Sequence, residues 1–234
     1  MFCVRGFWGI RQGVEQLLAL SGDEEDAVER VIPSKHEGAI RLLIGVEDDT
    51  VTPLRDYLQK HIPPGVLADV GGGEEILDIL WTAASRPAVL VLLTHLESAQ
   101  KPGEPSDPRL VLTPRQKWLL ARQITTRHQR DGAWEPPQSV VLLMACGTAA
   151  TDIGTLNDFV ISLTAAEAGA IIGTETPLFA ALAARFAEEV TSELWNGRPL
   201  GTAVVGFRRR LLAEFNPLGF LFSAYGDSDL CIAP

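Results

Sequence analysis

The stretch Ser139–Thr148, SVVLLMACGT, decides the interpretation of the whole chain. Apolar residues run without interruption over Val140–Ala145, and Cys146 and Gly147 follow them. A short apolar run with β-branched residues, bounded by turn formers, is typical of a strand that is buried on both faces. In open α/β sheets, ligands bind beyond the carboxyl ends of the strands. The sequence therefore predicts that Cys146 lies where chemistry usually takes place.

A second apolar run, Ala88–Thr94, has the same character and is followed by His95. The segment between the two runs is long enough for helical crossovers, so both strand ends can meet at one edge of the sheet. There, a thiolate at Cys146 would attack a peptide carbonyl, and His95 would protonate the leaving amine. The backbone N–H of Cys146, at a strand-to-loop turn, would help to hold the oxyanion.

Strand and helix patterns alternate from Ala39 onward, which predicts a largely parallel sheet with helices on both faces. The expected strands cover residues 39–46, 65–70, 88–94, 109–112, 140–145, 170–173, 219–223 and 229–232. The expected helices cover residues 53–61, 74–84, 113–128, 156–166, 176–195 and 201–215. The polar, proline-rich segment 97–108 is expected to be a long loop, either a lid or a disordered connection.

Composition excludes several classes of protein. The chain has 234 residues and a net charge of −10, which argues against a nucleic-acid-binding surface. Its three cysteines, Cys3, Cys146 and Cys231, show neither the spacing of a zinc site nor that of a disulfide framework. No cofactor and no metal are therefore expected.

Localisation is predicted from the apolar segments. The first residues lack the apolar core and cleavage site of a secretory signal. No apolar run approaches the roughly 20 residues that are needed to span a bilayer. We therefore expect a cytoplasmic protein without membrane contact, in which a free thiol stays reduced.

The glycine-rich stretch Val66–Gly73, VLADVGGG, offers a different reading. It resembles the first motif of S-adenosylmethionine-dependent methyltransferases. However, Glu74 and Glu75 follow where that motif usually continues with a further glycine, and two carboxylates would be unfavourable beside the carboxylate of the cofactor. No Gly-Lys-Ser/Thr follows either, so the stretch is not a P-loop.

Several segments together resemble the CHAT domains, which are caspase-like peptidases related to caspases and separases and often associated with TPR repeats. VVLLMACGTA (Val140–Ala149) is similar to the cysteine strand of that family, and VLVLLTHLES (Val89–Ser98) to its histidine strand. Three more segments resemble the family in order along the chain: FWGIRQGVEQ (7–16), AEAGAIIGTETPL (166–178) and NGRPLGTAVVGFRRRLLAEFNPLGFLFSAYGD (196–227). The resemblance extends over most of residues 40–232.

The resemblance implies a three-layer α/β/α sandwich around a mostly parallel six-stranded sheet. Residues 39–234 would form the peptidase domain, and residues 1–38 would be a lead-in segment packed on it. Cys146 would be the nucleophile and His95 its acid–base partner. The protein would be a bacterial cysteine endopeptidase that cleaves a protein substrate and is regulated by partner domains or chains.

One position departs from the family pattern. The histidine is usually followed by a glycine whose N–H helps to form the oxyanion hole, and here Leu96 stands in its place. We expect the backbone of Leu96 and Gly147 to contribute to the oxyanion hole, although leucine restricts the backbone where glycine would not. The alternative is a catalytically inactive CHAT-like module that binds partner proteins.

Acidic residues are expected beside the same edge of the sheet. Asp48 and Asp49 follow the first predicted strand, and Asp152 follows the cysteine. At strand ends they would favour basic residues at the cleavage point, and the open alternative is that they only form solvated turns.

Overall fold

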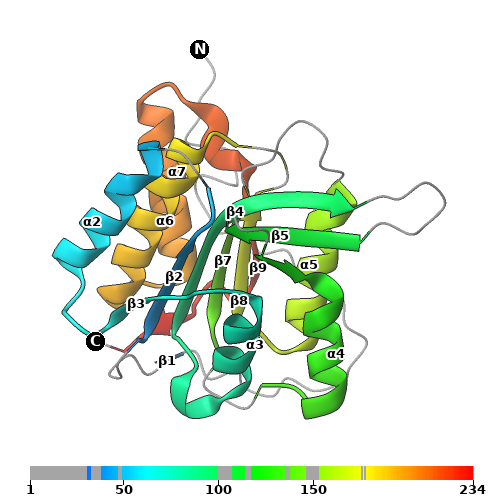
Figure 1. Cartoon of the computed structure of the whole chain (residues 1–234). Coiled ribbons are helices and arrows are strands. Elements are labelled where there is room, and N and C mark those ends of the chain that lie inside the picture. The colour runs from blue at the N-terminus through cyan, green and yellow to red at the C-terminus, as the bar shows by residue number, and fades with distance from the viewer. Residues whose placement is uncertain are drawn as a thin grey trace.

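The computed structural model describes residues 31–32, 38–46, 49–99, 107–113, 117–134, 138–145, 153–174, 176 and 178–233. Its centre is a sheet in the order β3-β2-β4-β7-β8-β9, shown in Figure 1. The strands are β2 (Ile40–Ile44), β3 (Leu67–Asp69), β4 (Val89–Ala99), β7 (Val140–Ala145), β8 (Ala170–Thr174) and β9 (Phe222–Gly226). Every pairing in this path is parallel except that of β8 with β9. The predicted mostly parallel sheet is thus confirmed.

Helices pack on both faces of this sheet. The α6 face is covered by α2 (Thr52–His61), α6 (Ala180–Trp195) and α7 (Leu200–Ala213), and the α5 face by α3 (Gly73–Trp81), α4 (Ala121–Asp131) and α5 (Ile153–Ala165) (Figure 1). Alternate strand residues supply the two cores: Leu93 and Met144 belong to the α6 face, and Leu92 and Leu143 to the α5 face. Both faces are apolar, which explains why these strands are near-continuous hydrophobic runs.

The structure corrects the prediction for residues 95–120. The strand expected to end at Thr94 continues to Ala99, and it pairs antiparallel with β5 (Asp107–Thr113), which in turn pairs with β6 (Lys117–Leu120). The expected loop 97–108 therefore begins and ends in strands. The helix expected over 113–128 begins only at Ala121, where the Gln123 side chain accepts a hydrogen bond from the Leu120 N–H at 2.8 Å.

The C-terminal part differs from the prediction by a few residues. The strand expected at 219–223 begins only at Phe222, as β9. Most of the expected range belongs instead to a 3-10 turn, η4 (Pro217–Leu221). The short strand expected near the end is present as β10 (Cys231–Ile232) and pairs with β1 (Val31–Ile32). Of the predicted lead-in segment 1–38, only residues 31, 32 and 38 are described. Among the described helices, none has the length and apolar character required to cross a membrane.

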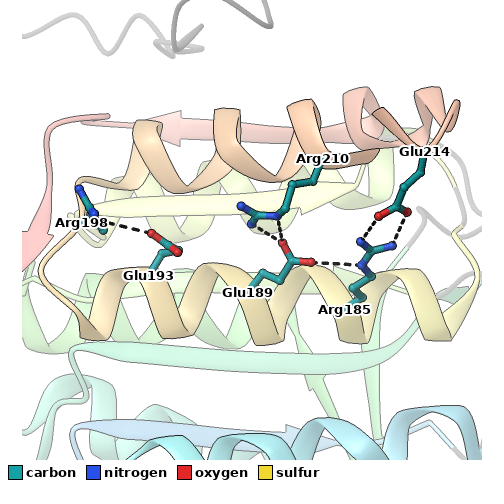
Figure 2. A network of polar contacts seen from close by, with 6 residues as sticks. All are labelled: Arg185, Glu189, Glu193, Arg198, Arg210 and Glu214. Carbon is teal, nitrogen blue, oxygen red and sulfur yellow. Dashed lines mark hydrogen bonds and ion pairs between the residues drawn. The ribbon is translucent and has the colours of Figure 1, made fainter. Parts of the chain in front are cut away.

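Ion pairs join α6 to α7, as Figure 2 shows. Arg185 donates to both carboxylate oxygens of Glu214, at 2.6 and 2.7 Å, and holds the pKa of that carboxyl below its usual value. Glu189 lies between two arginines: it accepts from Arg185 at 3.1 Å and from Arg210 at 2.6 Å. Bidentate and shared contacts of this kind fix the relative position of two helices better than isolated surface pairs do.

Replacing Glu189, which contacts two arginines, should lower stability more than replacing Glu193, which has one distant partner. We expect Glu189→Ala to lower the free energy of unfolding by about 1 kcal/mol, because both arginines lose a contact. The control is Glu193→Ala in the same helix, whose ion pair among the described residues, with Arg198, is 3.9 Å long. Urea denaturation of both variants measures the difference. Equal effects would show that the shared contacts contribute nothing.

Candidate active site at the carboxyl ends of β4 and β7

β4 changes its pairing partner at the candidate site. From Val89 to Thr94 it pairs in parallel with β7, and from His95 to Ala99 it pairs antiparallel with β5. The last pair of the parallel ladder joins Thr94 to Ala145, the final residue of β7. His95 is therefore the first residue beyond the parallel ladder, at the carboxyl edge of the central strands, although the strand itself does not end there.

Several predicted site residues lie outside the described residues. These are Cys146, Gly147, Asp48 and Asp152. Asp49 is described: it is exposed and opens the short 3-10 turn η2 (Asp49–Val51), which follows β2, the neighbour of β4. The proposed roles of all five residues remain predictions.

His95 is half-buried and shares one face of the β4-β5-β6 ladder with two cross-strand neighbours. It pairs with Val111, which in turn pairs with Trp118. Directly opposite residues in an antiparallel ladder point to the same side. The adjacent row, Leu96, Leu110 and Leu119, is buried in the core of the α5 face. The His95 row therefore points away from that core.

Leu96 is a core residue. Its exposure is 4%, and it pairs with Leu110 inside the α5-face core. It is not among the described residues with positive φ, so the backbone at this position does not require glycine. The leucine that departs from the family pattern is thus explained by packing in a strand that continues past the histidine.

Thr94 was not singled out from the sequence. Its side chain is fully buried, and its Oγ1 has no hydrogen-bond partner among the described residues. Leaving a buried hydroxyl unpaired costs about 1–3 kcal/mol, so such groups call for an explanation. The signal in the sequence was that Thr94 is the only polar residue of the run from Ala88 to Thr94. Its backbone pairs with the residue that precedes Cys146.

A pocket of about 500 Å³ lies between β6 and the N-terminal end of α3. It is lined by Gly71, Gly72, Gly73, Glu74, Glu75, Trp118 and Gln123. The glycine stretch that resembled a methyltransferase motif forms one wall. A Cβ on Gly73 would lie 2.8 Å from the Trp118 carbonyl oxygen, so the close approach of β6 accounts for glycine there without a cofactor.

Arg109 fixes the Trp118 side of this pocket. Its guanidinium lies 4.5 Å from the centre of the Trp118 ring and donates a hydrogen bond of 2.8 Å to Glu97. Among the described residues, no group of three histidine, cysteine or acidic side chains is arranged to hold a metal ion.

Comparison with known proteins gives no family assignment: the chain matches no protein-family model and no curated protein.

Replacing the Thr94 hydroxyl by a methyl group tests whether it is truly unpaired. We expect Thr94→Val to raise the free energy of unfolding by about 1 kcal/mol, because the desolvation cost disappears while the shape is kept. In the control Ser139→Ala, a buried hydroxyl that donates to the Pro87 carbonyl at 2.6 Å is lost, and stability should fall. Chemical denaturation measures both variants. A loss of stability in Thr94→Val would mean that the hydroxyl has a partner outside the described residues.

Proposed function

We propose that this protein is a cysteine endopeptidase with a caspase-like fold, in which Cys146 is the nucleophile and His95 the acid–base partner. The pairing of Thr94 with Ala145 carries the proposal. His95 and Cys146 each follow one member of this pair, on neighbouring parallel strands.

Strand alternation adds support. Leu93 and Met144 both face the α6 side of the sheet. Side chains alternate along a strand, so residues two positions apart lie on the same side. His95 is two positions after Leu93, and residue 146 is two positions after Met144. Both are therefore expected on the α6 side. A thiol and an imidazole on neighbouring strands and on the same side would be near enough to approach hydrogen-bond distance, which a catalytic pair requires.

The reaction proceeds in two steps. Cys146 Sγ attacks the peptide carbonyl carbon, the C–N bond breaks, and His95 transfers a proton to the departing amine. Water then attacks the thioester, with His95 accepting its proton, and the thiolate leaves as the carboxylic acid forms. Backbone N–H groups of Leu96 and Gly147 would stabilise the oxyanion in both steps. This chemistry needs no cofactor, and control by partner domains or chains remains part of the proposal.

Thiol labelling tests the catalytic pair. We expect a limiting amount of alkyne-tagged iodoacetamide to label Cys146 at least about tenfold faster than the half-buried Cys231, because a neighbouring imidazole favours the thiolate. His95→Ala should remove that advantage. The control is His61→Ala, an exposed histidine of α2 that should leave the labelling unchanged. Mass spectrometry of tryptic peptides gives the rate at each cysteine.

Equal, slow labelling of all three cysteines would contradict the proposal. That result would favour the alternative, a catalytically inactive module that binds partner proteins.

A further inference from the structure

The row His95–Val111–Trp118 connects the proposed acid–base residue to the pocket beyond β6. From this arrangement, and resting on the proposed peptidase function, we infer that Trp118 determines specificity on the leaving-group side of the substrate. The pocket beside it receives the side chain of a lysine or arginine at the third residue after the cleaved bond.

The direction of the substrate follows from the role of His95. An acid that protonates the leaving amine must lie beside the part of the substrate that follows the cleaved bond. That part of the polypeptide then continues from His95 across the exposed side of the ladder, over Val111 and toward Trp118. All three side chains belong to the same side of the ladder and are partly or fully accessible.

The distance selects the third residue. Directly opposite residues on paired strands are roughly 5 Å apart, so His95 and Trp118 are separated by roughly 10 Å. An extended polypeptide advances by roughly 3.3 Å per residue, and three residues cover this distance. Counted from the cleaved bond, which lies beside His95, the second residue passes Val111 at roughly 5 Å and the third ends at Trp118 at roughly 10 Å.

The pocket at this point suits a basic side chain. Its volume of about 500 Å³ is within the range of small-ligand sites. Its lining, among the described residues, contains the Glu74 and Glu75 carboxylates and no basic side chain, and the neighbouring Arg109 on the Trp118 ring is ion-paired with Glu97. Among the described residues, each carboxylate accepts a hydrogen bond through a single oxygen: Glu75 from the Gly71 N–H at 2.7 Å, and Glu74 from Gln123 at 3.3 Å. The second oxygen of each can therefore accept from an ammonium or guanidinium group.

The tryptophan supplies the second half of the recognition. Aromatic faces attract lysine and arginine, and Trp118 already holds the Arg109 guanidinium at 4.5 Å. The ion pair of Arg109 with Glu97 keeps that arginine and the ring in place. Trp118 as a whole is 36% exposed, so part of the residue is accessible to a substrate. Two carboxylates and an indole together discriminate a cationic side chain from a neutral one.

A library of proteome-derived peptides tests the inference with the full chain. Peptides are incubated with the protein, and mass spectrometry identifies each cleaved bond and the residues around it. We expect lysine and arginine to be enriched about fivefold at the third position after the cleaved bond. Trp118→Ala should abolish the enrichment while bonds without a basic residue there are still cleaved. Glu74→Gln combined with Glu75→Gln, which keeps the shape of the pocket, should do the same.

The control is Phe215→Ala, which truncates an aromatic residue that is 95% exposed and lies after α7. It should leave the preference unchanged. Cleavage without a preference at the third position, or a preference that survives both pocket variants, overturns this inference and leaves the peptidase proposal standing. If the wild-type protein cleaves no peptide while a cooperative urea unfolding transition shows it to be folded, the proposed function fails and the inference fails with it.

Discussion

The parallel pairing of β4 with β7 is the constraint on which the proposed catalytic pair depends. Six consecutive residues of each strand pair, from Val89 with Val140 to Thr94 with Ala145. Side chains along this ladder are almost entirely buried on both faces of the sheet. A shift of one residue would exchange the side chains of the two faces, and both tightly packed cores would have to rearrange. The register is therefore fixed by packing, and so is the position of His95 relative to the end of β7.

The sequence predicted the parts of the fold that depend on burial on two faces. The runs that became β2, β4, β7 and β8 are apolar at nearly every position, so they were recognisable as central strands. The helices between them were predicted from their alternation with these strands. The ends of these elements were less certain, because capping and pairing contacts decide them and those contacts come from residues far along the chain.

The antiparallel ladder of β4, β5 and β6 was predicted only in part, as a short strand at 109–112. Glu97 and Arg109 look like loop residues in the sequence, but they pair with each other across two strands and form an ion pair of 2.8 Å. Such a pair depends on tertiary pairing, which local periodicity does not contain. The same ladder accounts for Leu96: a position that seemed to weaken the catalytic hypothesis is a strand residue packed against Leu110. Trp118 belongs to this ladder and was not recognised from the sequence for the same reason.

We propose that the side chains of Cys146 and His95 face one another on the same side of the sheet. A crystal structure of the full chain that defines residues 146–152 measures the distance between Cys146 Sγ and the nearer His95 ring nitrogen. We expect a separation of roughly 4–7 Å on the α6 side of the sheet, compatible with a catalytic pair that tightens when substrate binds. Side chains that lie on opposite faces of the sheet would contradict it.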